Sequence, residues 1–281
     1  MWDLLHCRAM TPLVAIILGI VEGLTEYLPI SSTGHLILTG SILERWGLKG
    51  EGSGSFDIVI QLGAVLAVVV RYRDLLLSRV SGLASRDRRS LDLLIALIAG
   101  FLPTAAVGLL LRKAIKAHLF GVLPVAAALV IGGIAMILVE RRRRAQRTVG
   151  LVGLEHVTAR RALVIGFGQC FSLWPGTSRS MCTLLAGQLT GLSTATAAEF
   201  SFLLALPTLG AATMYETYKG RHELAAAGGL NVAIGFVVSF LVAWAVIAGF
   251  VKYLQKRGLE PFGYYRIALG LVVFLLLGWQ R

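Results

Sequence analysis

Residues 22–35 read EGLTEYLPISSTGH, and they interrupt an otherwise apolar segment that begins near residue 10. A second polar interruption, QCFSLWPGTSRS at residues 169–180, divides an apolar segment in the other half of the chain. Each stretch runs from an acid or amide through a proline into a turn rich in serine and threonine. Ionisable groups within apolar, membrane-like sequence are costly and mark functional sites by default. We therefore expect the two stretches to form one composite site.

The composition is that of an integral membrane protein. Of the 281 residues, 56% are hydrophobic and 15% are charged, and the mean hydropathy is +0.77. A soluble protein carries about 25% charged residues. The apolar runs are continuous rather than alternating with period two, which favours α-helices over a β-barrel. They lie at about residues 10–21, 56–70, 91–111, 119–139, 162–174, 181–190, 200–215, 229–251 and 262–279.

Several runs reach the length of about 20 residues that a membrane span requires. The segments 10–28 and 162–174 are too short or too interrupted, and they predict half-helices that enter the membrane and return. The predicted fold is an all-α polytopic membrane protein with one domain over residues 1–281. We expect about ten helical segments, about six of them spanning. The expected connectors are 47–55, 73–90 and 141–158.

The formal net charge of +12 suggests a nucleic-acid-binding protein, but the positions of the basic residues argue against it. Most Lys and Arg residues fall between apolar segments, at 71–89, 140–161 and 252–257. This is the positive-inside pattern, which places those connectors on the cytoplasmic side. We therefore expect the membrane as a partner, and no nucleic acid.

The same charge pattern predicts the topology. If residues 71–90 are cytoplasmic, the successive crossings make residues 10–46 dip in from the outside. Residues 162–190 then dip in from the cytoplasmic side. The two interrupted segments are therefore expected to be re-entrant hairpins that enter from opposite faces.

The two hairpins also resemble each other in sequence. LPISS at residues 28–32 aligns with WPGTS at residues 174–178. We expect an inverted-topology repeat with halves at about 10–139 and 160–279, whose broken helices meet near the midplane.

Glu22 and Glu26 are spaced i, i+4, so they share one helix face and repel each other. A shared proton, a bound divalent cation or a nearby cationic side chain would relieve the repulsion. The structural alternative is that the two acids only cap or bridge helices. Both are candidates for catalysis and for metal binding.

The serines and threonines after each proline are expected to open a helix. Proline ends the first half-helix, serine and threonine are preferred N-caps, and a helix N-terminus binds anions. Ser32 is the candidate nucleophile. The candidate substrate-binding hydroxyls are those of Ser31, Thr33, Thr177, Ser178 and Ser180.

Arg179 adds a fork of donors suited to phosphate oxygens, although it would also suit a simple ion pair with Glu22 or Glu26. His35 lies one helical turn after Ser32 and can accept or donate a proton near neutral pH. Gln61 and Glu199 are expected as supporting partners, and Asp57 as a helix cap.

An anion cradle, a hydroxyl, a histidine and two carboxylates suit hydrolysis of a phosphate or diphosphate ester. The apolar setting suits a lipid substrate. A carrier-lipid flippase or anion transporter is the alternative, because broken helices in an inverted repeat are also transporter architecture.

At these motifs the chain resembles the undecaprenyl-diphosphate phosphatase family, also called the bacitracin-resistance proteins. The resemblance covers nearly the whole length. Its motifs are Glu22–Glu26, Pro29–His35, Phe56–Gly63, Trp174–Ser180 and Glu199–Leu203. One departure is that Met181 and Cys182, rather than small residues, precede Thr183.

The resemblance implies a multi-pass bacterial inner-membrane enzyme with its active site open to the periplasm. The enzyme would remove one phosphate from undecaprenyl diphosphate, for which bacitracin competes, and so recycle the carrier lipid for cell-wall synthesis. The resemblance also implies an inverted repeat and a divalent cation, Mg²⁺ or Ca²⁺. The family's functional residues correspond to Glu22, Glu26, Ser32 (or Ser31), His35, Arg179 and Thr183.

Overall fold

A computed structural model describes residues 10–48, 54–119, 121–147, 149–219 and 229–277. Apart from one isolated bridge between Leu151 and Leu192, the regular structure in this part of the chain is helical. The elements are α1 (Pro12–Thr25), α2 (Ser32–Arg45), α3 (Gly54–Arg71), α4 (Arg73–Ala84), α5 (Arg88–His118), α6 (Val122–Ala145), η1 (Leu154–His156), α7 (Ala159–Cys170), η2 (Phe171–Leu173), α8 (Arg179–Leu189), α9 (Thr194–Lys219), α11 (Gly229–Lys256) and α12 (Glu260–Leu277).

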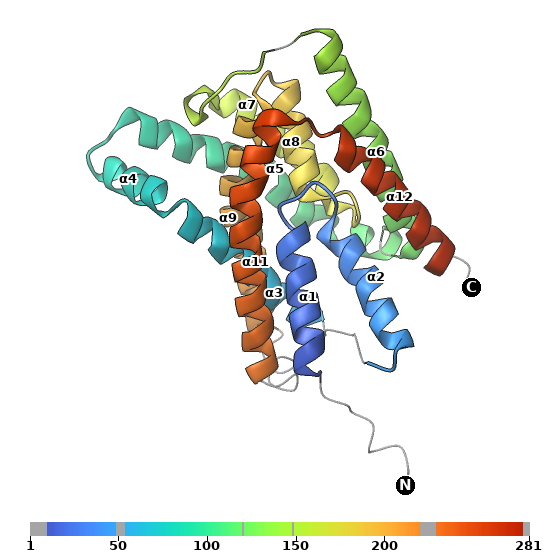
Figure 1. Cartoon of the computed structure of the whole chain (residues 1–281). Helices are drawn as coiled ribbons and strands as arrows, with labels where there is room; N and C mark the ends of the chain where they lie inside the picture. Colours follow the sequence, from blue (N-terminus) through green and yellow to red (C-terminus); the bar gives the residue numbers. More distant parts are fainter. Residues whose placement is uncertain (1–9, 49–53, 120, 148, 220–228, 278–281) are drawn as a thin grey trace.

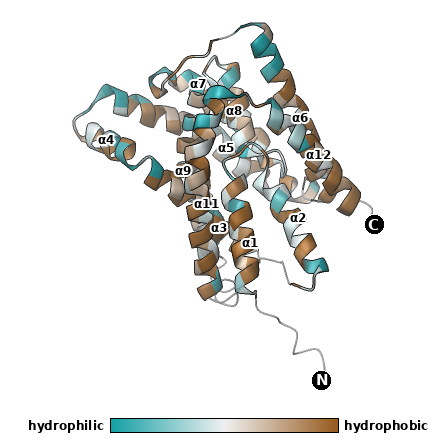
Figure 2. Ribbon diagram, in the orientation of Figure 1, coloured by the Kyte–Doolittle hydropathy of each residue, from teal (hydrophilic) through white to brown (hydrophobic). Residues whose placement is uncertain are grey.

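Four helices in the described residues are long and apolar enough to cross a membrane. They contain Arg88–Leu111, Val122–Ala145, Thr194–Met214 and Gly229–Lys256. Figure 2 shows hydrophobic flanks along α6 and α11 and hydrophilic residues toward their upper ends. The prediction of an all-helical membrane protein is confirmed.

Glycines let the long helices approach each other closely. In Figure 1, α1 and α11 lie side by side, as do α6 and α12. A Cβ at Gly23 of α1 would lie 2.7 Å from Ser239 O, and one at Gly63 of α3 would lie 2.5 Å from Phe236 O. Gly133 of α6 would meet Gly263 O at 2.6 Å in the same way. Small residues at such crossings are typical of helix packing in membranes.

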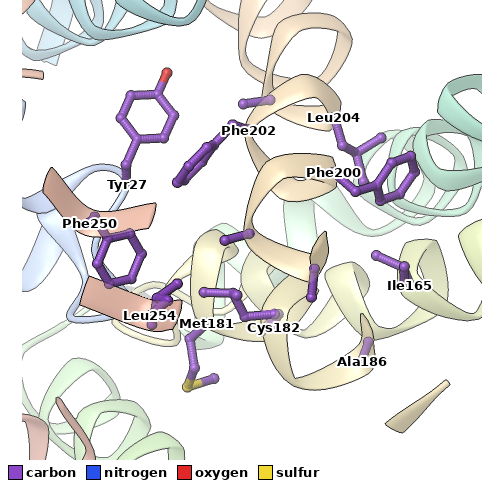
Figure 3. Packing of buried hydrophobic residues seen from close by; sticks show 14 of the residues in the cluster. Tyr27, Ile165, Met181, Cys182, Ala186, Phe200, Phe202, Leu204, Phe250 and Leu254 are labelled. Atoms are coloured by element: carbon purple, nitrogen blue, oxygen red, sulfur yellow. The ribbon is translucent and has the colours of Figure 1, made fainter. Parts of the chain in front are cut away.

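An aromatic cluster joins the first interruption to the core (Figure 3). Tyr27 packs edge-on against Phe202 of α9 with 5.3 Å between ring centroids, and Phe202 lies 6.4 Å from Phe250 of α11. The buried Tyr27 hydroxyl donates to Ala64 O of α3 at 2.9 Å. Tyr27 of the polar stretch therefore contacts two helices, α3 and α9, and Phe202 extends the cluster to α11.

The prediction that residues 73–90 form a connector is wrong in one respect, because they contain α4 and the start of α5. Its sequence has no proline, and its leucines and arginines are good helix formers. The break between the helices is at Asp87, whose side chain accepts hydrogen bonds from the Ser90 hydroxyl at 2.8 Å and from Ser90 N at 2.9 Å. These bonds lower the pKa of Asp87. Most of the connector 47–55 lies outside the described residues.

Replacing Gly63 with alanine should destabilise the protein, because the new Cβ would meet the backbone of α11 and force α3 away from it. We expect a loss of about 1–3 kcal/mol, typical of overpacking, measured as equilibrium unfolding in mixed micelles. Gly249→Ala on α11 is the matched control, since a Cβ there meets nothing within 4 Å. Equal stability of the two variants would contradict the close crossing.

Candidate active site

The first interruption is a turn between two helices. Glu26 caps α1, the chain turns through residues 27–30, and α2 begins at Ser32. Ser31 has a φ of 74°, and its hydroxyl accepts a hydrogen bond from Gly34 N at 3.3 Å. The broken helix and the serine cap are found as predicted. The first backbone N–H groups of α2 therefore lie beside the turn.

The second interruption has the same local geometry. After α7 and η2, α8 begins at Arg179, and Ser178 has a φ of 74°. The Ser178 hydroxyl accepts a hydrogen bond from Met181 N at 3.3 Å. Gly176 has a φ of 92°, and a Cβ there would lie 2.6 Å from Val125 O, so this position requires glycine. Serine rarely adopts a positive φ, so both turns depend on their surroundings to hold them.

The two turns contact each other through a buried ion pair. Arg179 Nη2 donates to Glu26 Oε1 at 3.0 Å, and the two side chains are 8% and 5% exposed. The Ser180 hydroxyl also donates to Leu28 O at 2.9 Å. The two polar stretches, separated by over half the chain, therefore lie against each other.

Arg179 is held on several sides. Its Nη1 donates to Ser201 O at 3.0 Å and to Ser201 Oγ at 3.2 Å. Its Cζ lies 5.5 Å from the centroid of the Tyr27 ring. Its Nε has no hydrogen-bond partner among the described residues. Because the Arg179 guanidinium is held in place and its Nε–H has no acceptor among the described residues, it is suited to bind an oxyanion.

Ser32 is hydrogen-bonded to the same acid. Its hydroxyl donates to Glu26 Oε2 at 2.7 Å. A carboxylate that accepts a hydrogen bond from a hydroxyl is placed to take its proton and so activate it as a nucleophile. Glu26 thus links Ser32 to Arg179.

Glu22 lies one turn before Glu26 on α1. Its side chain is buried, and its Oε1 has no hydrogen-bond partner among the described residues. With Asp57 and Gln61 it lines a cavity of about 310 Å³. No group of three or more His, Cys, Asp or Glu side chains forms a metal site in the described part of the chain. Two carboxylates and an amide nevertheless fit Mg²⁺, which commonly takes its remaining ligands from water and substrate phosphate.

A larger cavity of about 730 Å³ shares Ser32, Thr33 and Gln61 with the first cavity. Its polar end contains Glu26, Ser32 and Arg179. Side chains of α5, η2 and α9 form its apolar part, among them Phe101, Leu109, Leu173 and Leu209. An apolar cavity with a few convergent polar groups is typical of a ligand site, and this one suits an amphipathic molecule with an anionic head.

His35 lies toward α12 and lines neither cavity. Its Nδ1 is 2.7 Å from Ser31 O and its Nε2 is 2.7 Å from the Tyr265 hydroxyl. The His35 and Tyr265 rings stack with 5.6 Å between centroids. Because a carbonyl only accepts, Nδ1 donates to it. The catalytic role of His35 stays a prediction.

The remaining predicted residues divide into two groups. Ser31, Thr33, Gln61 and Ser178 line the large cavity. Thr177, Ser180 and Thr183 do not line it, and they are buried. The Thr183 hydroxyl lies 2.6 Å from Ser201 Oγ, so it supports the residue that holds Arg179.

The sequence prediction did not include four residues that the structure brings to the site: Tyr27, Ser201, Tyr265 and Arg266. Tyr27 lies in the polar stretch 22–35 and Ser201 lies in the motif Glu199–Leu203, so the sequence carries a usable signal for both. Asp57 lies in the first turn of α3, where the sequence predicts an acid that complements the helix dipole, and it also lines the cavity beside Glu22.

The fold and the site define a helical membrane protein in which two serine-capped turns meet at a buried ion pair. The family model described as Bacitracin resistance protein BacA matches residues 15–272. The chain belongs to this family.

Curated relatives agree with this assignment. An undecaprenyl-diphosphatase of Sorangium cellulosum is 60% identical over 264 residues, which is 93% of this chain and 85% of the relative. Undecaprenyl-diphosphatase 2 of Rhodospirillum rubrum is 48% identical, covering 95% and 94% of the two chains. An undecaprenyl-diphosphatase of Rhizorhabdus wittichii is 43% identical, covering 95% and 98%.

Glu26→Ala should cost about 3–5 kcal/mol of unfolding free energy, because it leaves the Arg179 charge buried without its carboxylate. Equilibrium unfolding in mixed micelles measures the loss. Glu260→Ala is the comparison: Glu260 pairs with Arg141 and Arg144 at 2.9 Å, but both arginines are more than half exposed. Solvent screens such pairs, so its loss should be smaller. The reverse order would contradict the tight burial of the Arg179 pair.

Proposed function

We propose that this chain hydrolyses undecaprenyl diphosphate to undecaprenyl phosphate and inorganic phosphate. The observation that carries the proposal is the continuous contact from the Ser32 hydroxyl through Glu26 to Arg179 at the polar end of an apolar cavity. The names of the relatives support it, since each is an undecaprenyl-diphosphatase.

In the proposed reaction, Arg179 and the N-termini of α2 and α8 bind the diphosphate oxygens. Glu26 takes the proton of Ser32 as Ser32 Oγ bonds to the terminal phosphorus. The bond from that phosphorus to the bridging oxygen breaks, and undecaprenyl phosphate leaves. Water then cleaves the phosphoserine bond and releases phosphate. In the alternative, water attacks directly and the Glu26–Ser32 pair orients it.

A divalent cation, Mg²⁺ or Ca²⁺, is part of the proposal. Glu22 is its proposed ligand because it has an unpartnered buried oxygen, and Asp57 and Gln61 line the same cavity. Glu26, the other expected ligand, already accepts hydrogen bonds on both oxygens. The cation would offset negative charge on the diphosphate.

We further propose an inverted-topology repeat with six spans and two re-entrant hairpins. The matching turns at Ser31 and Ser178 support it, since both have a φ of 74° and both serines cap the next helix. The packing also supports it: α1 of one half packs on α11 of the other, and α7 packs on α5.

The positive-inside pattern supports an inner-membrane location with the basic connectors in the cytoplasm and the site open to the periplasm. Bacitracin, acting on the same lipid diphosphate, would then lower turnover by competing for substrate.

Ser32→Ala should reduce phosphate release from undecaprenyl diphosphate at least about 1,000-fold if Ser32 is the nucleophile. Purified protein in detergent with Mg²⁺ gives the measurement. Ser78→Ala on α4 is the control, because the Ser78 hydroxyl is exposed and donates to Leu75 O within its own helix. Activity of Ser32→Ala above about a tenth of the parent would identify water as the attacking group. Undiminished release by Arg179→Ala would overturn the proposed function.

The cation can be tested without turnover. Mn²⁺ binding, followed by electron paramagnetic resonance, should weaken at least about tenfold in Glu22→Gln, because a neutral amide replaces a charged ligand. Glu44→Gln is a control from the rim of the same cavity. EDTA should stop phosphate release and Mg²⁺ should restore it. Equal Mn²⁺ affinity of Glu22→Gln and the parent would remove Glu22 from the cation site.

A further inference from the structure

Arg266, in the middle of α12, is the largest fully buried side chain in the described residues. Its surroundings are apolar helix, where a charged group is costly. No carboxylate in the described part of the chain pairs with it, and its Nε has no hydrogen-bond partner there. A charge without an ion-pair partner at such depth requires an explanation beyond packing.

The Arg266 guanidinium binds three backbone carbonyls. Nη1 donates to Pro29 O at 3.2 Å, and Nη2 donates to Gly176 O at 2.9 Å and to Ala128 O at 3.1 Å. Pro29 and Gly176 each lie two residues before a strained serine, Ser31 and Ser178. One side chain therefore bridges the two turns and ties both to α6.

The surrounding sequence leaves room for this bridge. A Cβ at Gly132 of α6 would collide with Arg266 Nη2, so a larger residue there would displace the guanidinium. The adjacent Tyr265 contacts the first turn as well, through His35 to Ser31 O. Two consecutive residues of α12 thus support the turn that carries Ser32.

We propose that Arg266 is a positioning residue for phosphate release, an inference that rests on the proposed function. It holds the two turns in the arrangement in which Arg179 reaches Glu26 and Glu26 reaches Ser32. It touches none of the groups proposed to react. Its planar fork is suited to several acceptors at once, which a lysine ammonium is not.

A misplacement of about 1 Å in a catalytic group can cost 10²-fold in rate. Arg266→Met should therefore lower kcat about 100-fold, whereas KM should change less than about threefold because the apolar part of the cavity is untouched. Arg266→Lys should recover only part of the loss. Phosphate release and melting temperature are measured on the same purified samples.

Arg143→Met is the matched control. Arg143 also donates to two backbone carbonyls, Gln188 O at 2.6 Å and Leu192 O at 3.1 Å, but it lies far from both turns along α6. Its loss should lower the melting temperature and leave kcat unchanged. A loss of kcat in Arg266→Met that Arg143→Met reproduces at the same melting temperature would reduce Arg266 to a stabilising role.

If Arg266→Met does not fold, Gly132→Ala tests the same bridge by displacing the guanidinium without removing it. A kcat near the parent value in a folded Arg266→Met or Gly132→Ala protein would overturn the inference. Absence of phosphate release by the unaltered protein would instead overturn the proposed function, so the two failures are distinguishable.

Discussion

A helix broken within an apolar protein leaves backbone groups that no water can satisfy, and the protein must supply their partners. This chain breaks two helices, and it meets the requirement with side chains from distant segments of the chain. The Ser180 hydroxyl binds Leu28 O, and the Arg266 guanidinium binds Pro29 O and Gly176 O. Each serine cap satisfies an N–H of its own helix. The two turns form one site because side chains of the second half of the chain bind backbone carbonyls of the first turn.

Local sequence was sufficient to predict the broken helices. The proline and the run of serine and threonine fixed where α2 and α8 begin, and both N-caps are the serines expected. The sequence also allows Arg179 to pair with an acid of the first stretch, and the structure shows that pair with Glu26. These features depend on short-range chemistry and on the cost of burying charge, both of which are visible in the sequence.

Other features depend on contacts between distant segments, which the sequence alone does not display. His35 follows Ser32 by one turn, yet its ring points toward Tyr265, because α12 lies on that side of α2. In the sequence Arg266 is a charge within the apolar segment 262–279. Nothing nearby in the sequence indicates its three carbonyl partners. The sequence predicts a connector where α4 lies for another reason. The segment is basic and has few apolar residues, which is typical of a connector, although nothing in it prevents a helix.

Under the proposed function, the ion pair between Arg179 and Glu26 means that an incoming phosphate does not find a bare cation. Binding is an exchange, in which one anion takes the place of another at the same guanidinium. The affinity for phosphate therefore reflects the difference between the Arg179–phosphate pair and the Arg179–Glu26 pair. A doubly charged phosphate group competes with Glu26 better than a singly charged one. The exchange would also leave Glu26 with Ser32, which donates to its other oxygen, as its remaining hydrogen-bond partner of the two.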